Sequence, residues 1–259
     1  MSPSTITIKN QTIIDLKDDE TCPISEEDLF KGYIRHRTII NVLNSKMFLP
    51  NYDADLVQKC IYNSKSYFEQ NCLKLVDKYL NKHSTIIDIG ANIGNHTLYW
   101  ANESHAKKIY AFEPIPYIFK ILKKNIEINN LKNRVKLYNI GLADKQENGE
   151  IKSFCKQNFG GTRLRVLKSN TKDIIPLNTL DSFNIKEDNI DMLKIDVEGM
   201  DFEVLSGALN TIKKYKPIIM IESFPDSFEK SNSLLNNLGY EQKHDFGGFE
   251  YLYIYKDKK

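Results

Sequence analysis

The sequence predicts an α/β protein built on a mostly parallel sheet, and three observations support that fold class. Short apolar runs rich in β-branched residues alternate with longer segments of helical periodicity from Thr85 onward. This alternation is typical of parallel strands that helices cover on both faces. Near the end, two strand-like runs flank Gly247 and Gly248 and predict an antiparallel hairpin. The 259 residues are enough for one such domain with an N-terminal extension.

Each element follows from its local pattern. Residues 1–80 are expected to form a helical N-terminal extension that caps one end of the sheet, and residues 81–259 the main domain. Segment 144–175 is too long for an ordinary connection, so we expect it to be a functional insertion. Helical periodicity covers 116–131 and 199–215. The expected strands are 85–89, 108–114, 135–142, 191–199 and 216–223, followed by a hairpin of 240–246 and 249–256.

Composition argues against several kinds of partner. A net charge of +2 gives no general attraction to nucleic acid or to anionic membranes. No apolar run approaches the ~20 residues that span a bilayer, and the N-terminus does not resemble a signal peptide. The four cysteines form no CxxC pair, which fits a reducing compartment. We therefore expect a cytoplasmic protein with no membrane span and no nucleic-acid partner.

The stretch IIDIGANIG places Asp88, Gly90, Asn92 and Gly94 between a strand and a helix. Such a loop lets the backbone approach a nucleotide-like ligand closely. Its spacing differs from the GxGxxG of dinucleotide-binding proteins, and a carboxylate at Asp88 would repel a diphosphate. S-adenosylmethionine carries an ammonium and a sulfonium, which a carboxylate attracts. The loop therefore favours this cofactor, whose product is S-adenosylhomocysteine.

Glu113 ends the second expected strand, where an acid can accept hydrogen bonds from both hydroxyls of a ribose. Alone it would suit NAD equally well. A turn-capping role for Asp88 and a solvated strand end for Glu113 are the structural alternatives. Together on consecutive strands, the two acids favour a nucleoside-type cofactor.

The fourth expected strand ends in LKIDVEG, which places Lys194, Asp196 and Glu198 on alternating positions of one face. Glu222 ends the fifth strand. Because ligands bind at the carboxyl ends of parallel strands, these acids could orient an acceptor hydroxyl, remove its proton or hold a divalent cation. The alternative is a structural Lys194–Asp196 ion pair, with Glu198 capping the next helix.

These segments together resemble a known family. IIDIGANIGNHTLYWA, YAFEPIPYIFKILKKNIEINN, PLNTLDSF and DMLKIDVEGMDFEVLSGALNTIKKYKPIIMIES are similar, in this order, to the FkbM family of S-adenosylmethionine-dependent methyltransferases. The resemblance runs from about Phe48 to Glu222. Asp201 stands where the family's KIDVEGxE motif has its second glutamate.

The resemblance implies the class I methyltransferase fold, a Rossmann-like seven-stranded sheet whose last strand is antiparallel. It also implies methyl transfer to an oxygen of a small molecule, such as a sugar hydroxyl in surface-polysaccharide synthesis. Carried over by position, it implies Asp88, Gly90, Asn92 and Gly94 around the methionine part of the cofactor, Glu113 at the ribose, Gly141 and Leu142 near the adenine, and Asp196 and Glu198 beside the transferred methyl group.

For the chemistry, we expect Glu198 to act as the general base, with Asp196 orienting it or binding the cofactor or acceptor. A rival, less favoured, is a magnesium ion held by Asp196, Glu198 and Glu222. His96 is a further candidate base, although a histidine capping the turn is the more common role. The acceptor is expected to be a sugar or nucleotide-sugar, whose phosphate could be clamped by Arg163 and Arg165.

Three other functional classes have weaker support in the sequence. The chain has no Pro-Pro and no Pro-Cys pair, which argues against methylation of base amines and of base carbons. An NAD-dependent oxidoreductase conflicts with the glycine spacing. A non-catalytic scaffold conflicts with the intact acids Asp88, Glu113, Asp196 and Glu198. A homodimer through the N-terminal extension is an open possibility, as is the identity of the acceptor.

Overall fold

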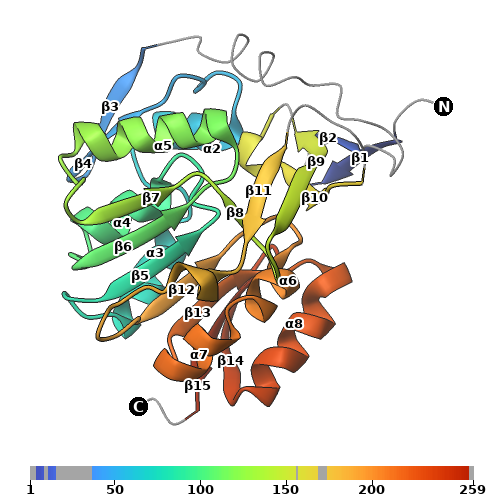
Figure 1. Cartoon of the computed structure of the whole chain (residues 1–259). Helices are drawn as coiled ribbons and strands as arrows, with labels where there is room; N and C mark the ends of the chain where they lie inside the picture. Colours follow the sequence, from blue (N-terminus) through green and yellow to red (C-terminus); the bar gives the residue numbers. More distant parts are fainter. Residues whose placement is uncertain (1–3, 9–10, 16–36, 156, 169–173, 257–259) are drawn as a thin grey trace.

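A seven-stranded sheet forms the centre of the computed structural model, which describes residues 4–8, 11–15, 37–155, 157–168 and 174–256. The strand order is β14-β15-β13-β12-β5-β6-β7 (Figure 1). The strands are β5 (Thr85–Ile89), β6 (Lys108–Phe112), β7 (Val135–Tyr138), β12 (Met192–Ile195), β13 (Ile218–Glu222), β14 (Tyr240–Gly247) and β15 (Glu250–Tyr255).

Six of these strands run in the same direction, and β15 alone lies antiparallel, between β13 and β14. This topology confirms the predicted Rossmann-like class I fold with its antiparallel terminal hairpin. The chain winds outward from β5 in one direction through β6 and β7, and then in the other direction from β12 through β13. The carboxyl ends of β5 and β12 therefore meet where the winding reverses, which is where such sheets bind ligands.

Helices cover both faces of the sheet, because side chains of each buried strand alternate between two apolar clusters. On β5, Ile86 joins one cluster and Ile87 the other. The first cluster contains buried residues of α4 (Asn95–Asn102) and α5 (Pro116–Ile128). The second contains residues of α6 (Asp201–Ser206), α7 (Leu209–Tyr215) and α8 (Pro225–Asn237).

A second sheet arises from the N-terminal strands and the long insertion. Its path is β1 (Ser4–Ile8), β2 (Gln11–Asp15), β9 (Glu147–Cys155), β11 (Ile175–Asn178) and β8 (Gly141–Leu142), and β10 (Arg163–Val166) also pairs with β9. The prediction of one strand over 135–142 is wrong. The chain leaves the central sheet after β7, and β8 pairs instead with β11 in the second sheet.

The N-terminal extension contains strands as well as helices. Within 37–80, the hairpin of β3 (Ile39–Val42) and β4 (Ser45–Phe48) precedes α2 (Leu56–Ser64), α3 (Gln70–Val76) and the short helix η1 (Asp77–Tyr79). The buried amide of Asn125 on α5 accepts a hydrogen bond from the N–H of Phe48 at 2.6 Å, which anchors the hairpin. Residues 16–36 of this extension lie outside the described residues.

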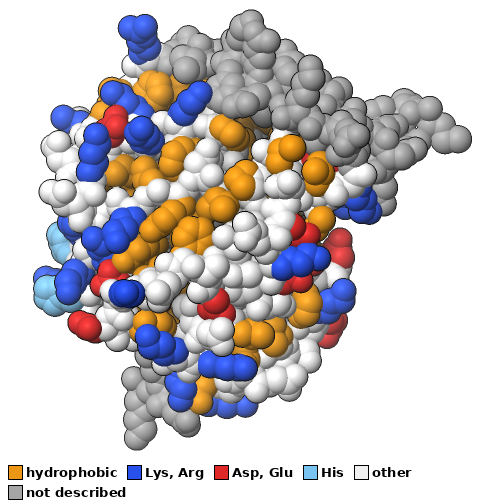
Figure 2. Space-filling view, viewed as in Figure 1, with side chains coloured by type: hydrophobic (Ala, Val, Ile, Leu, Met, Phe, Trp, Pro, Cys, Tyr) orange, Lys and Arg blue, Asp and Glu red, His pale blue; other side chains and the backbone are white. Residues whose placement is uncertain are grey.

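The surface in Figure 2 carries no single basic field. Lysine and arginine side chains are spread over several parts of this face, among acidic and apolar ones (Figure 2). This distribution agrees with the small net charge of +2. Within the ranges that the structure describes, no helix is both long and apolar enough to cross a bilayer.

Asp201 joins three elements on the second face of the sheet. Its side chain is fully buried and accepts hydrogen bonds at 2.6 Å from the hydroxyls of Ser223, Ser227 and Ser231. These serines belong to the end of β13 and to α8, so one carboxylate at the start of α6 fixes both. Asp201 stands where the family's motif has a glutamate, and in this structure it holds these three elements together.

We expect Asp201→Ala to lower the free energy of unfolding by about 3 kcal/mol, because buried hydroxyls lose a charged acceptor. Urea denaturation of the purified variant measures this loss. The matched control is Glu229→Ala. Glu229 is an exposed acid on α8, the helix that carries Ser227 and Ser231, and its loss should change stability by less than about 0.5 kcal/mol. Equal effects of the two substitutions would contradict this account.

Candidate functional site

A cavity of about 180 Å³ opens at the carboxyl ends of the parallel strands. Three parts of the chain enclose it: the strand ends, residues 56–57 and 68–69 of the N-terminal extension, and residues 158–164 of the insertion. Ten of the site residues expected from the sequence line it: Gly90, Asn92, His96, Glu113, Gly141, Leu142, Arg163, Asp196, Glu198 and Glu222. Three expected residues do not belong to its lining: Asp88, Gly94 and Arg165.

The floor of the cavity is the glycine loop after β5. Gly90 has a φ of +76°, and a methyl group there would lie 1.7 Å from the carbonyl oxygen of Asp196. Both the left-handed backbone and the close approach of the two strand ends therefore require glycine. Gly94, with a φ of +89°, turns the chain into α4.

Lys194 connects the two strand ends beneath this loop. Its ammonium donates to the carbonyl oxygen of Gly90 at 2.9 Å and lies 3.0 Å from Asp196 Oδ2 and 3.7 Å from Asp88 Oδ1. Burial alone would lower the pKa of Lys194, but Asp196 and Asp88 raise it above its ordinary value. The lysine is therefore a charged group held between two carboxylates.

This arrangement separates Asp88 from the cavity that it was expected to line. Its side chain is fully buried, and it accepts a hydrogen bond from the hydroxyl of Thr97 at 2.5 Å. Its charge faces Lys194 instead of the cavity, so it reaches a bound ligand only through the lysine and the loop. Desolvation would raise the pKa of Asp196, yet the Lys194 ammonium holds it below its usual range. Of the two carboxylates beside Lys194, Asp196 is thus the one that lines the cavity.

Glu113, just beyond β6, lies on the opposite side of the glycine loop. Its two oxygens accept backbone N–H bonds from Asn92 at 2.9 Å and from Ile115 at 2.8 Å. Burial nevertheless raises the pKa of its carboxyl to about 7. Each carboxylate oxygen can accept a further hydrogen bond, so the residue can still bind a pair of hydroxyls from the cavity.

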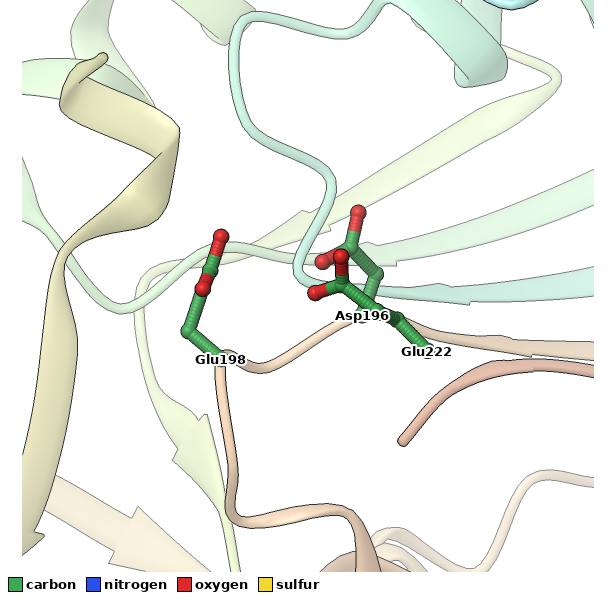
Figure 3. Close-up of side chains that lie close together, drawn as sticks. All are labelled: Asp196, Glu198 and Glu222. Atoms are coloured by element: carbon green, nitrogen blue, oxygen red, sulfur yellow. The ribbon is translucent and has the colours of Figure 1, made fainter. Parts of the chain in front are cut away.

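Asp196, Glu198 and Glu222 form a cluster of three carboxylates in the lining of the cavity. One oxygen from each lies within 4.8 Å of the others. Figure 3 shows all three carboxylates turned to the same side of the backbone that carries them. Glu198 does not owe its position to strand alternation, because β12 ends at Ile195 and Glu198 has a φ of +55°. A left-handed backbone is uncommon at a residue other than glycine, and it turns the chain sharply at this point.

Two further acids near this group were missed by the sequence reasoning. Glu250 on β15 stands opposite Glu222 across the antiparallel pair, and burial with the neighbouring charge of Glu69 raises its pKa to about 7. Glu69 lies 3.5 Å from Nε2 of His96 in the first turn of α4. A lone acid inside the apolar run FEYLYIY was a signal for Glu250, whereas the local sequence gave none for Glu69.

The insertion closes over the cavity and is held there by the extension. Asp55 caps α2 through the N–H of Gln58 at 3.0 Å and accepts the N–H of Phe159 at 2.8 Å. Its burial raises its pKa to about 6. Backbone at Gly160 approaches Asn92 so closely that a methyl group there would lie 2.3 Å from the Asn92 amide nitrogen. An aspartate just before a helix predicts a helix cap from the sequence alone. It does not predict the contact with Phe159, which lies 104 residues further along the chain.

The two arginines of the insertion have different surroundings. A register shift between Arg163 and Leu164 interrupts the alternation of β10. Arg163 lines the cavity, and its guanidinium lies 4.5 Å from the centre of the Phe224 ring. Arg165 points elsewhere and pairs with the buried Glu150 at 2.8 Å. The expected clamp of two arginines is therefore reduced to Arg163 at the cavity itself.

Residues 88–242 match the methyltransferase FkbM domain, which is more than half of the chain. The chain belongs to the FkbM methyltransferase family. This family domain includes the glycine loop, Glu113 and the three clustered carboxylates of Asp196, Glu198 and Glu222. The family resemblance expected from the sequence is thereby confirmed.

Two curated relatives are also methyltransferases. The chain is 27% identical over 177 residues to methyltransferase sdnD of Sordaria araneosa, covering 55% of this chain and 66% of that protein. It is 28% identical over 148 residues to methyltransferase 1 of Beauveria bassiana (strain ARSEF 2860), covering 48% and 58%. The chain thus spans less than two thirds of the length of either relative.

Among solved structures, an FkbM methyltransferase from Methylobacillus flagellatus KT aligns with 19% identity and a TM-score of 0.48. The alignment covers 68% of this chain and 44% of that one.

Removing the charge of Lys194 should expose the repulsion between Asp88 and Asp196. We expect Lys194→Met to lower the free energy of unfolding at pH 8 by about 3 kcal/mol, because it leaves a buried carboxylate without its cation. The exposed Lys213→Met on α7 is the matched control and should have almost no effect.

The loss should stay constant from pH 8 to pH 5 and shrink below about pH 4. In the native protein the depressed pKa of Asp196 contributes stability above its ordinary pKa, and this contribution is lost as pH falls through the lowered value. In the variant, Asp196 lacks the cation that lowers its pKa, so this contribution is absent. Urea denaturation between about pH 8 and pH 3 measures the difference. A loss that stays constant with pH would contradict the charge argument.

Proposed function

We propose that the protein is an S-adenosylmethionine-dependent O-methyltransferase. Its acceptor is a hydroxyl of a small molecule, a sugar or nucleotide-linked sugar used in surface-polysaccharide synthesis. The observation that carries this proposal is the arrangement of the cavity. A glycine loop and a buried strand-end acid line it together with three carboxylates that lie close to one another.

The residues present fit the cofactor. Glu113 retains acceptor capacity for the two ribose hydroxyls, and Gly141 and Leu142 line the part of the cavity where the adenine would lie. Gly90 and Asn92 border the position of the methionine end, while Gly94 and Asp88 shape this loop from outside the cavity. When bound, S-adenosylmethionine supplies the electrophilic methyl group.

Glu198 is the residue we assign as general base. Asp196 is held ionised by Lys194, and a carboxylate with a depressed pKa is a weak proton acceptor. Glu198 stands on the loop beyond the strand, at the cavity wall. Asp196 then orients the acceptor hydroxyl, and Glu222 shares this end of the cavity. His96 is the alternative base, although its Nε2 faces Glu69.

A metal-assisted route is the second candidate, because Asp196, Glu198 and Glu222 bring oxygens within 4.8 Å of one another. Oxygen ligands of this kind suit Mg²⁺, which would lower the pKa of an acceptor hydroxyl. The Lys194 ammonium argues against it, since it already neutralises part of the charge on Asp196. The metal-free route is therefore preferred.

Binding of S-adenosylhomocysteine tests the identity of the cofactor. At 100 times its dissociation constant, the ligand should add about 2.7 kcal/mol to the free energy of unfolding, seen as a rise in Tm. NAD⁺ at the same concentration should give no shift. Stabilisation by NAD⁺ alone would contradict the methyltransferase proposal, and binding without any turnover would favour a scaffold role.

The affinity should also depend on pH through Glu113, whose pKa of about 7 lies well above the ordinary value. Ribose hydroxyls donate to the ionised carboxylate, so binding favours loss of its proton. S-adenosylhomocysteine should bind about tenfold more tightly at pH 8 than at pH 6. In Glu113→Gln, titration calorimetry should find weaker binding with most of this pH dependence gone. An unchanged pH profile would contradict the assignment.

Turnover separates the two catalytic routes. Glu198→Gln should lower kcat at least about 100-fold, because the glutamine cannot take up the hydroxyl proton, while the affinity for S-adenosylhomocysteine stays unchanged. EDTA should leave the native enzyme active. Activity that is lost in EDTA and restored by Mg²⁺ would instead support the metal-assisted route. Near-native turnover of the variant would exclude Glu198 as the base.

A further inference from the structure

A second cavity adjoins the first on the far side of Glu198. Its volume is about 160 Å³, close to the 180 Å³ of the first cavity. Four residues line both cavities: Arg163, Leu164, Glu198 and Phe224. The two cavities therefore meet at these residues, and groups bound in them would lie on either side of Glu198.

Three cationic side chains in this second cavity have their charge available for a ligand. The Arg163 guanidinium lies over the Phe224 ring at 4.5 Å, and its buried Nε has no hydrogen-bond partner among the described residues. The Lys230 ammonium lies 5.9 Å from the centre of the Phe202 ring. Within the described part of the chain, neither Lys152 nor Lys230 has an ion pair with a carboxylate. Their N–H groups can therefore donate to a bound molecule.

Three carboxylates balance these cations. Glu198, Glu203 and Asp226 line the same cavity, so its formal charge is zero. A diphosphate offers only acceptor oxygens, and it would meet three carboxylates as well as three cations. Hydroxyl groups both donate and accept hydrogen bonds, so a neutral polyhydroxylated molecule can use both kinds of group. The chemistry of the cavity thus favours an uncharged sugar ring over a nucleotide.

We propose that the second cavity binds the sugar ring next to the one that is methylated, so that the acceptor is an oligosaccharide or a glycan chain. Lys152, Arg163 and Lys230 would donate to its hydroxyls, and Glu203 and Asp226 would accept from them. This inference rests on the proposed function of the first cavity. It narrows the acceptor from sugars in general to linked sugars, and it disfavours a nucleotide-linked monosaccharide.

Ligand-observed saturation-transfer NMR on the full chain, saturated with S-adenosylhomocysteine, tests the inference. The probes are neutral disaccharides of α- and β-linked glucose, galactose and mannose, the matching methyl monosaccharides, and UDP-glucose. We expect at least one disaccharide to bind about tenfold or more tightly than its monosaccharide, since hydrogen bonds to charged groups contribute this much. UDP-glucose should bind no more tightly than methyl glucoside.

The double variant Lys152→Ala/Lys230→Ala should remove the advantage of the disaccharide, because both lysines line only the second cavity. Its affinity for S-adenosylhomocysteine and its Tm should stay unchanged. The exposed Lys213→Ala on α7 is the matched control, and it should keep the disaccharide advantage.

The other outcomes overturn the inference in distinguishable ways. If UDP-glucose binds best and the double variant abolishes its binding, the cavity is an anion site. If no disaccharide exceeds its monosaccharide, or the advantage survives in the double variant, the cavity is not a sugar subsite. Either result leaves the cofactor proposal intact. Failure to bind S-adenosylhomocysteine would instead remove the proposed function, and this inference with it.

Discussion

The ammonium group of Lys194 is the contact on which the two halves of the site depend. It bonds to the glycine loop after β5 and faces Asp196 at the end of β12, while Asp88 lies on its other side. These two strands are the neighbours at which the winding of the sheet reverses. A cation at this point lets two carboxylates stand close together and keeps Asp196 ionised. The ends of β5 and β12 therefore keep a fixed spacing at the cavity.

The rest of the cavity comes from segments added to this core. The N-terminal extension and the insertion share a sheet, since β2 pairs with β9, and they share the carboxylate of Asp55. The two segments therefore hold each other in place beside the strand ends. Under the proposed function, the central sheet would fix the position of methyl transfer, and the added segments would shape the space in which an acceptor lies. Variation in these segments would then change the acceptor without altering the core.

Much of the central sheet was predictable, because buried parallel strands have a strong local signal. The expected strand 85–89 coincides with β5, and the strands 108–114, 191–199 and 216–223 each contain an observed one. The terminal hairpin was equally clear from its paired glycines. The error at 135–142 has a physical cause. An apolar run shows that a strand is buried, but not that the chain passes from one sheet to another within it.

The candidate site was predictable where its residues stand at strand ends, as Glu113, Asp196 and Glu222 do. Contacts between distant segments were not. The pairing of Glu69 with His96, the approach of Glu250 to Glu222 and the bond from Phe159 to Asp55 depend on tertiary packing. The β-bulge that separates Arg163 from Arg165 is likewise a property of the paired strands and not of the local sequence.

The acids around Glu222 also bear on how the enzyme would distinguish its two forms of cofactor. Glu69, Asp196, Glu198, Glu222 and Glu250 gather near one end of the cavity, and Lys194 offsets only part of their charge. Methyl transfer converts a sulfonium cation into a neutral thioether. A negatively charged surrounding stabilises the first more than the second. If the protein acts as proposed, these carboxylates would thus weaken retention of the spent cofactor and limit product inhibition.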